Sequence, residues 1–549
     1  MNRLYFGDNL HVLKKYIADG SVDLIYLDPP FNSKANYNVL FRSPKGHESH
    51  AQITAFEDTW HWAEQAETEF TELTHQRNTD VAKMMIALRD FLGENDMMAY
   101  LTMMANRLLE LHRVLKPTGS LYLHCDPTAS HYLKVVLDGV FGKTNYRTEI
   151  SWKRQSAHSD AKQGRKQYGN VRDIIFFYTK SDDWQWNSLY TPYSEDYKED
   201  FYRFTEAETG RRYRLSDLTA PGGAAPEKRN PHYEFLGVTR YWRYTQENMQ
   251  KLYEEGRIVQ TGPGRVPAYK RYLDEMPGVS LQNEWNDIRP ASGNEALGYP
   301  TQKPLALLER IISASSNEGD VVLDPFCGCG TAIHAAQKLK RKWMGIDITH
   351  LAISLVEKRL RSAFPDISFD IQGTPKDFDS ARDLAQRDKY QFQWWACSLV
   401  NAQPYQGKKK GADTGIDGLI YFQDDQSGID KARSLPRKVV VSVKAGENVG
   451  VAMIRDFAHV IDREKAALGL FITLAEPTRA MKEEAAAFGF YQSLGTTIFP
   501  KLQILTIKGL LDGTIRARYP DLTHGGLTFK KAKKEKTEEQ LTLGDDIAF

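Results

Sequence analysis

Two stretches near the amino terminus have the continuous apolar pattern of strands that are buried on both faces. They are "VDLIYLD", residues 22–28, and "GSLYLHCD", residues 119–126. Between them, residues 96–115 have helical periodicity that stops at "KPTG". The alternation of strand and helix returns at residues 320–349, "DVVLDPFCGCGTAIHAAQKLKRKWMGIDIT". This order predicts an α/β fold built on a largely parallel sheet.

The rest of the chain divides by its pattern into further parts. Residues 151–298 are rich in Tyr, Trp, Arg and Lys but have weak periodicity, so we expect an insertion that need not belong to the sheet. Residues 373–389 are interpreted as a linker. Residues 390–515 have strands and helices of their own, and the charged tail, residues 516–549, is predicted to be disordered.

Composition narrows the class of protein only slightly. The 549 residues carry a net charge of +1, which gives no global basic signature but leaves room for a local basic groove. No apolar run is long enough to span a membrane, and the first residues do not read as a signal peptide. The cysteines, at positions 125, 327, 329 and 397, form no metal-ligand framework, so we expect free thiols in a reducing cytoplasm.

The first buried strand ends in an unusual way, on Asp28, Pro29, Pro30 and Phe31. Proline cannot donate to a sheet ladder, so the strand must stop there. A carboxylate, a stiff turn and an aromatic ring therefore follow directly after a buried strand, where they are candidates for chemistry.

A second candidate lies in "VVLDPFCGCGT", where Asp324 ends a strand and Gly328 and Gly330 precede a helix. Glycines allow the backbone to turn tightly and to approach a ligand. Asp347 ends the next strand, where an acid can accept hydrogen bonds from ribose hydroxyls. The loop lacks the third glycine of a dinucleotide site and the Lys-Ser/Thr of a P-loop, which leaves a nucleoside cofactor without a pyrophosphate. A tight strand-to-helix turn with no ligand fits the same pattern.

Together these stretches resemble the DNA amino-methyltransferases that use S-adenosylmethionine. The matching motifs are Asp28-Pro29-Pro30-Phe31, Phe326-Cys327-Gly328-Cys329-Gly330, Thr301-Gln302-Lys303-Pro304 and the segment around Asp8. The catalytic motif precedes the cofactor motif, which is the order of the family's beta class. The resemblance covers about residues 1–370. It implies a Rossmann-like class I methyltransferase sheet made of a catalytic half, residues 1–150, and a cofactor half, residues 299–372, with the target-recognition region at residues 151–298 between them.

The resemblance also implies a set of cofactor-binding residues. They are Asp8, Thr301, Gln302, Lys303, Pro304, Asp324, Pro325, Phe326, Gly328, Gly330 and Asp347. Because Asp28 and Asp324 both end predicted strands, they can line one crevice outside the carboxyl ends of a shared sheet, although they lie far apart in sequence.

The chemistry of methyl transfer gives the residues of the Asp-Pro-Pro-Phe motif their expected roles. The exocyclic amine of adenine is a poor nucleophile, because its lone pair is delocalised into the ring. Asp28 can accept one amine hydrogen, and the turn at Pro29 and Pro30 can aim a backbone carbonyl at the other. Phe31 offers a ring face to a base that has left the duplex. Asp at position 28 resembles the adenine-directed branch, and N4 of cytosine is kept as an alternative target.

The segment after residue 150 contains a dense basic stretch that we expect to contact double-stranded DNA. Its residues are Lys153, Arg154, Lys162, Arg165, Lys166 and Arg172. His124 and Cys125, which end the strand at 119–126, could also line the crevice, and a packing role fits them equally well.

Residues 390–515 resemble the Mrr-like branch of the PD-(D/E)xK nucleases. Asp417 at a strand start and Lys444 on the following strand match the family's catalytic positions, with Asp417 a candidate magnesium ligand. The position that the family fills with an acid or Gln is Ser442 here, a weak metal ligand. Asp413, Asp424 or Glu447 could substitute for it, or the unit could have lost cleavage.

The sequence therefore predicts an adenine-specific DNA methyltransferase fused to a restriction-type nuclease domain. One alternative is a methyltransferase whose carboxy-terminal domain only binds DNA, and another is a DNA-binding regulator without catalysis. A homodimer and a separate restriction subunit are both left open as partners.

Overall fold

The computed structural model describes residues 2–30, 36–42, 48–57, 62, 64–75, 79–155, 166, 168–220, 230–293, 295–297, 299, 302–405, 415–422, 437–493, 497–520 and 533–535. Four of the residues singled out from the sequence, Phe31, Lys162, Arg165 and Thr301, lie outside this part, as do Asp413, Asp424 and most of the tail. Two compact units are found: one contains residues 1–187 and 283–549, the other Ser188–Gln282.

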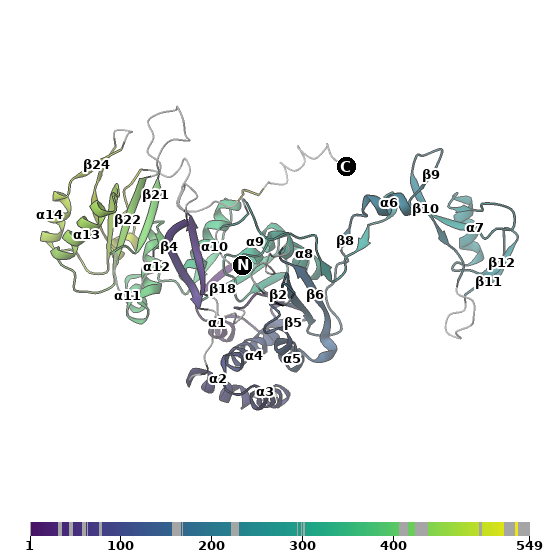
Figure 1. Cartoon of the computed structure of the whole chain (residues 1–549), viewed down its shortest axis with the longest axis horizontal. Helices are drawn as coiled ribbons and strands as arrows, with labels where there is room; N and C mark the ends of the chain where they lie inside the picture. The colour runs from purple at the N-terminus through teal and green to yellow at the C-terminus, as the bar shows by residue number, and fades with distance from the viewer. Residues whose placement is uncertain are drawn as a thin grey trace. The chain divides into compact units, whose positions relative to one another are not determined.

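A nine-stranded sheet forms the centre of the methyltransferase-like part among the described residues (Figure 1). Its order is β16-β6-β7-β5-β2-β17-β18-β1-β19, with all strands parallel except β7. The bounds are β1 Arg3–Phe6, β2 Val22–Leu27, β5 Leu115–Cys125, β6 Tyr146–Lys153, β7 Arg172–Thr179, β16 Glu284–Trp285, β17 Val321–Asp324, β18 Lys342–Asp347 and β19 Asp370–Gln372. The predicted α/β class and the predicted strands at 22–28 and 119–126 are confirmed.

Helices pack on both faces of this sheet (Figure 1). The helices of this part are α1 Asn9–Tyr16, α2 Glu64–Thr74, α3 Thr79–Leu92, α4 Asp96–Val114, α5 Ser130–Phe141, η1 Lys143–Asn145, α8 Leu305–Ser315, α9 Thr331–Lys338 and α10 His350–Ala363, of which α2 and α3 pack on α4 and α5. The helix predicted at 96–115 is α4, whose N-cap Asn95 accepts a hydrogen bond from the Met98 N–H at 3.0 Å. A separate hairpin pairs β3 Asn36–Arg42 with β4 Glu48–Glu57.

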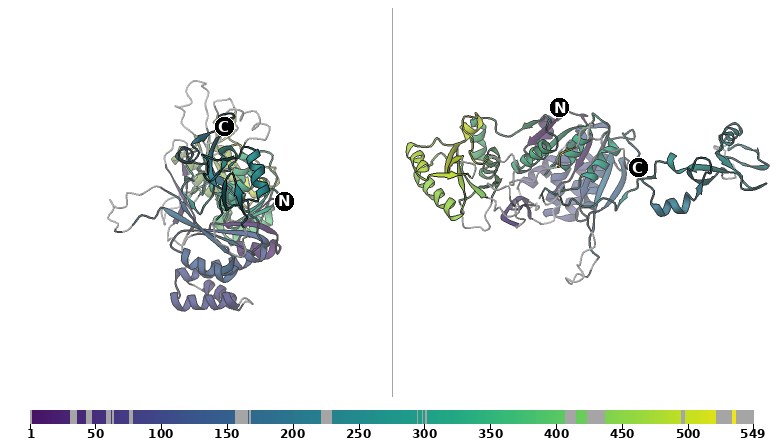
Figure 2. Two further views of the ribbon diagram at one scale, coloured as in Figure 1. Left: turned by 90° about the vertical axis from the view of Figure 1, so that its right-hand side faces the viewer. Right: turned by 90° about the horizontal axis from the view of Figure 1, so that it is seen from above.

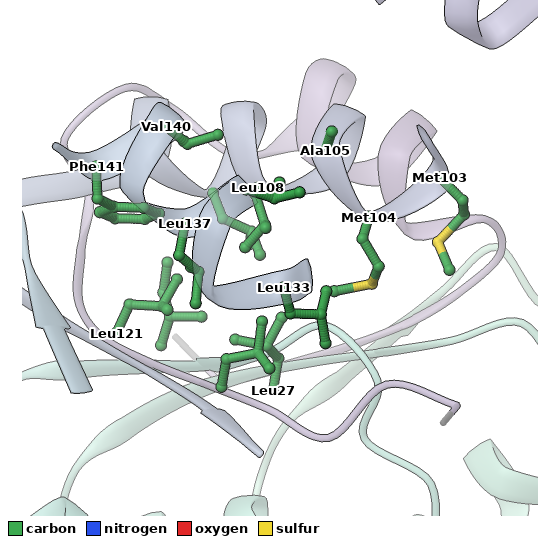
Figure 3. Packing of buried hydrophobic residues seen from close by; sticks show 14 of the residues in the cluster. Leu27, Met103, Met104, Ala105, Leu108, Leu121, Leu133, Leu137, Val140 and Phe141 are labelled. Carbon is green, nitrogen blue, oxygen red and sulfur yellow. The ribbon is translucent and has the colours of Figure 1, made fainter. Parts of the chain in front are cut away.

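Alternation along the strands decides which side chains reach which face. Leu27 of β2 and Leu121 of β5 join a core with α4 and α5, in which Leu108 and Leu137 interlock (Figure 3). Because successive side chains in a strand point to opposite faces, Tyr26 lies on the other face of the sheet. Burial of this apolar core supplies the main driving force for the fold.

The predicted insertion at residues 151–298 is wrong in its boundaries, because both of its ends belong to the sheet. The run Ile174–Tyr178 is buried in β7, and Ile150 and Trp152 of β6 are also buried. The basic stretch of sequence between these strands obscured that apolar pattern.

The compact unit Ser188–Gln282 is smaller than the predicted insertion. It has a four-stranded sheet, β13-β14-β10-β9, and a hairpin, β11–β12. The bounds are β8 Tyr190–Thr191, α6 Glu195–Phe201, β9 Phe204–Thr205, β10 Arg212–Asp217, β11 His232–Phe235, β12 Val238–Tyr241, α7 Gln246–Glu254, β13 Ile258–Val259, β14 Ala268–Tyr272, η3 Leu273–Glu275 and β15 Val279–Ser280. Its small core centres on Trp242, Met249 and Ile258.

A five-stranded sheet, β20-β21-β22-β23-β26, forms the carboxy-terminal domain (Figure 2). Alternate residues of β22 face two cores: Val439 and Val441 pack with α11 and α12, while Val440 packs with α13 and α14. The bounds are α11 Phe378–Arg387, α12 Lys389–Leu399, β20 Gln403–Pro404, β21 Gly418–Phe422, β22 Arg437–Lys444, α13 Val451–Arg463, β23 Leu468–Thr473, α14 Arg479–Ala487, β24 Phe490–Gln492, β25 Ile498–Pro500, β26 Leu502–Thr506 and α15 Ile507–Leu511.

The predicted linker at 373–389 is also wrong, because most of it is the helix α11. Asp377 caps this helix by accepting a hydrogen bond from the Ser380 N–H at 2.8 Å. Ala381, Leu384 and Ala385 are buried in the core of the carboxy-terminal domain. The spacing of these apolar residues at three and four positions was the missed signal. In the part of the chain that the structure describes, no helix is long and apolar enough to cross a membrane.

Candidate functional site

Asp28 follows the last residue of β2, and its two carboxylate oxygens have different surroundings. Its Oδ2 accepts a charged hydrogen bond from Lys303 Nζ. Its Oδ1 is buried and has no hydrogen-bond partner among the described residues. A buried carboxylate oxygen without a donor is costly, which points to a ligand that supplies the donor.

The glycine loop connects β17 to α9, as the sequence predicted, and it is fixed by the next strand. Gly328 N–H donates to Asp347 Oδ2 at 3.0 Å, at a φ of +48°. Gly330 has a φ of +74°, and a Cβ there would lie 2.8 Å from a methyl group of Val356. Only glycine combines this backbone conformation with the close approach of α10.

Two carboxyl groups at the ends of β17 and β18 are strongly buried. Burial raises the pKa of Asp347 to about 6, although this group accepts hydrogen bonds from the Thr349 N–H and hydroxyl at 2.9 Å. Burial also raises the pKa of Asp324 well above its usual value, and the nearby charges of Asp28 and Asp347 add to the shift. The carboxyl groups of β2, β17 and β18 therefore meet at one edge of the sheet.

Asp8 precedes α1, where it caps the helix and pairs with a buried arginine. It accepts from the His11 N–H at 3.1 Å, and Arg107 of α4 donates to its other oxygen at 2.7 Å. Arg107 also donates to Asn9 Oδ1 at 2.6 Å, and Asn9 in turn donates to the Pro325 carbonyl at 2.9 Å. This network ties the start of α1 to the glycine loop.

These residues surround a cavity of about 310 Å³. The predicted residues that line it are Asp8, Asp28, Pro29, Pro30, Gln302, Lys303, Asp324, Pro325, Phe326, Gly328 and Asp347. Pro304 and Gly330 do not line it: Pro304 caps α8, and Gly330 packs against α10. The prediction that Asp28 and Asp324 share a crevice is confirmed, because β2 and β17 are neighbours.

Several lining residues were not predicted. They include Tyr26, Glu69, Arg107, Tyr299 and Thr349. Tyr26 could have been found from its place two residues before Asp28 on a strand. Glu69 and Arg107 come from helices, and their sequence gives no signal of a site.

Among the predicted DNA-contacting residues, Lys153, Lys166 and Arg172 are exposed. Arg154 is half-buried, and its Nε lies 3.4 Å from Asp173 Oδ1. Three of the four described residues are therefore free to meet solvent or a ligand, and Arg154 has a carboxylate beside it.

In the carboxy-terminal domain, Asp417 lies directly before β21 and beside the end of β22. Its Oδ2 accepts from the Val443 N–H at 2.7 Å and lies 3.4 Å from the Ser442 hydroxyl. Lys444 ends the same strand, β22. Glu447 is 81% exposed and lies 3.9 Å from Arg382. Within the described residues, no group of three or more His, Cys, Asp or Glu side chains is placed to hold a metal ion.

The fold and the cavity define an α/β protein with a nucleoside-type cofactor site at the switch point of its sheet. A family model described as DNA methylase matches residues 22–358, and the chain belongs to this family. A second model, described as restriction endonuclease, matches residues 384–492, so a restriction endonuclease domain is fused to the methylase.

Curated relatives agree with this assignment. The type II methyltransferase M.EcaI of Enterobacter cloacae is 28% identical over 65% of this chain and 69% of its own length. The StyLTI Mod subunit, from a type III restriction-modification enzyme of Salmonella typhimurium, is 27% identical over 62% of this chain and 50% of its own. The DNA adenine methyltransferase YhdJ of Escherichia coli is 27% identical over 64% of this chain and 81% of its own length. The match to this chain thus spans only half of the Mod subunit.

Proposed function

We propose that this chain transfers a methyl group from S-adenosylmethionine to the exocyclic N6 amine of adenine in double-stranded DNA, as part of a restriction-modification system. The observation that carries the proposal is the state of Asp28. One of its oxygens is held by Lys303, while the other is buried without a donor in the cavity that the glycine loop lines.

The lining residues fit the cofactor. Asp347 can accept hydrogen bonds from the ribose hydroxyls of the cofactor, and Asp8 can accept one from the amine of the cofactor's adenine. A Cβ at Gly328 would lie 3.2 Å from the ring of Tyr299, another residue that lines the cavity, so glycine avoids crowding this wall. A cavity of about 310 Å³ is within the usual range for small-molecule sites. When bound, the sulfonium supplies an activated methyl group with a neutral thioether as leaving group.

Asp28 then acts on the target amine. Its Oδ1 would accept one amine hydrogen, which would turn the nitrogen lone pair toward the methyl group that the cofactor would supply. The released proton goes to Asp28. Lys303 holds the carboxylate in one orientation, and Pro29 and Pro30 stiffen the turn beside it. Positioning accounts for much of the rate in such a displacement.

Two considerations favour adenine over cytosine. Position 28 is Asp, which the sequence resemblance assigns to the adenine-directed branch. One of the relatives described above is a DNA adenine methyltransferase. We further propose that the unit Ser188–Gln282, with the exposed basic residues Lys153 and Arg172, contacts the DNA.

The test is methyl transfer from labelled S-adenosylmethionine to unmethylated DNA of diverse sequence, followed by base analysis. The wild-type protein should yield N6-methyladenine, and Asp28→Ala should abolish transfer while cofactor binding is kept. Asp23→Ala is the matched control, because Asp23 of β2 forms an ion pair with Lys116 of β5 at 2.7 Å but does not line the cavity. Wild-type protein that binds the cofactor and methylates no adenine in any of this DNA would rule the proposal out.

A second proposed activity is DNA cleavage by the carboxy-terminal domain. It is favoured by the match to the restriction endonuclease model and by Asp417, which contacts the strand that ends in Lys444. Cleavage is measured with and without Mg²⁺ for wild type, Asp417→Asn and Lys444→Ala. If all three leave the DNA intact under every condition, the domain serves only to bind DNA. A homodimer, a separate restriction subunit and a cytoplasmic location remain predictions.

A further inference from the structure

A chain of buried hydrogen bonds leads away from the cavity and is used by none of the motifs above. The Tyr26 hydroxyl and His124 Nδ1 are 2.9 Å apart, and His124 Nε2 and Asp173 Oδ2 are 3.1 Å apart. The exposed fractions are 2% for Tyr26, 0% for His124 and 2% for Asp173. A tyrosine, a histidine and a carboxylate thus form one continuous polar line inside the protein.

Three neighbouring strands bring these residues together. Tyr26 is on β2, His124 on β5 and Asp173 on β7, in the order β7-β5-β2. Alternation places Tyr26 and His124 on the face opposite the core of Leu27 and Leu121. The ring of His124 also meets Tyr26 and Trp152 edge-on, with centroids 6.3 and 5.7 Å away.

Charges around Asp173 fix the direction of the hydrogen bonds. Burial opposes ionisation, but the hydrogen bond from His124 and the charges of His124, Lys303 and Arg154 leave the pKa of Asp173 below its usual value. A carboxylate only accepts, so His124 Nε2 carries a proton. Burial raises the pKa of Tyr26, so its hydroxyl stays protonated beside His124 Nδ1.

The Tyr26 end of this line of hydrogen bonds lies at the cavity. Tyr26 lines the cavity, and it lies two residues before Asp28 on the same side of the strand. The hydrogen bond to His124 engages the Tyr26 hydroxyl, which favours the ring as the part of Tyr26 that a ligand meets. An apolar side chain could fill the same place without burying a histidine and a carboxylate, so packing alone does not account for the arrangement.

We propose that Tyr26 positions the target base beside Asp28, and that His124 and Asp173 are positioning residues that act through Tyr26. This inference rests on the proposed function. The hydrogen bonds of His124 and Asp173 set the plane of the Tyr26 ring, and the ring forms a wall of the space in which the amine must approach Asp28. A small rotation of this wall changes the direction of approach of the amine more than it changes cofactor binding.

The test compares Tyr26→Phe with Tyr122→Phe. Tyr122 is the register partner of Tyr26 on β5, is buried, and bonds Ser315 Oγ at 2.7 Å, but does not line the cavity. Tyr26→Phe should lower kcat by about tenfold or more while the KM for S-adenosylmethionine stays within about twofold. Tyr122→Phe should leave both constants within about twofold of wild type, because it also removes a tyrosine hydroxyl but at a position that does not line the cavity.

A double variant tests whether Asp173 acts through Tyr26. Asp173→Asn should also lower kcat, since an amide can donate to His124 Nε2 and move its proton to Nδ1. The pair Tyr26→Phe with Asp173→Asn should be no slower than the slower single variant. Multiplied effects, or a Tyr26→Phe variant that behaves like Tyr122→Phe, would overturn the inference. If Asp173→Asn does not fold, the two tyrosine variants alone decide. Failure of the wild type to transfer methyl groups would instead refute the proposed function.

Discussion

The ion pair between Lys303 and Asp28 allows a sharp prediction, because one substitution removes the cation and leaves the carboxylate in place. Lys303→Met keeps a side chain of similar length and loses the ammonium group. The Asp28 Oδ1 already has no hydrogen-bond partner in the described structure, so the variant would leave both oxygens without a donor.

The structure sets the size of the expected effect. The side chains of Lys303 and Asp28 are 10% and 16% exposed, so the pair is nearly but not fully buried. Removal of one partner from a buried pair costs about 3–5 kcal/mol, and the residual exposure argues for the lower end, about 3 kcal/mol. That corresponds to a change of roughly a hundredfold in the ratio of folded to unfolded protein.

The assay is a double-mutant cycle in denaturant unfolding, with methyl transfer measured on the same samples. The variants are Lys303→Met, Asp28→Asn and the two combined. Because the combined variant buries no unpaired charge, it should be more stable than Lys303→Met alone, with a coupling free energy of about 2 kcal/mol or more. Methyl transfer should be lost in all three, because Asp28 is missing or no longer held.

Two results would contradict this account of the ion pair. One is a Lys303→Met variant within about 0.5 kcal/mol of wild type, the usual range for an unimportant surface change. The other is a pair of single effects that simply add in the combined variant. Normal methyl transfer by Lys303→Met would show that Asp28 does not need the lysine for catalysis.

Three further predictions concern the cofactor loop and the nuclease-like domain. Gly330→Ala should lower the free energy of unfolding, measured in denaturant, by more than Gly20→Ala. Both glycines have a positive φ, but only at Gly330 would the added Cβ clash, with Val356. Equal losses of unfolding free energy in the two variants would show that the clash is relieved. Burial raises the pKa of Asp347 to about 6, so affinity for S-adenosylmethionine, measured by calorimetry, should fall as the pH drops through about 6, where the carboxylate gains a proton and loses an acceptor site. Asp347→Asn should remove that dependence, and an unchanged pH profile in this variant would refute it. Ser442→Glu restores an acid beside Asp417 and should raise Mg²⁺-dependent cleavage by about tenfold or more in a plasmid assay; no gain would show that another residue fills that role or that the domain does not cut.

The central sheet could be predicted from the sequence because its strands are continuous apolar runs that end on acids. Such runs identify strands buried on both faces, and the helix between them has clear periodicity. Strand β7 and the end of β6 were assigned to the insertion because a basic stretch of sequence separates them. Helix α11 was taken for a linker because its apolar face consists mainly of small residues, Ala381 and Ala385, next to Leu384.

The candidate site could be predicted to the level of a shared crevice, and less well to the level of single contacts. Parallel strands bring their carboxyl ends to one edge, which is why Asp28, Asp324 and Asp347 line one cavity. The same rule does not say which side chain bonds which. Lys303 was predicted to hold the cofactor because it belongs to a cofactor motif, and that stays a prediction. The folded protein adds that Lys303 lines the cavity and bonds Asp28, a contact that the motif does not reveal.

Residues that motifs do not cover depend on register between strands, which a single sequence does not reveal. Tyr26, His124 and Asp173 come from three strands and meet only because β5 lies between β2 and β7 in the sheet. A shift of one residue in the pairing would move each side chain to the opposite face. The line of hydrogen bonds that reaches the cavity is therefore a property of the assembled sheet. Its residues look like ordinary strand positions in the sequence. Their part in methyl transfer is tested by comparing Tyr26→Phe with Tyr122→Phe, because these buried tyrosines are paired in the sheet, each loses a hydroxyl, and only Tyr26 lines the cavity.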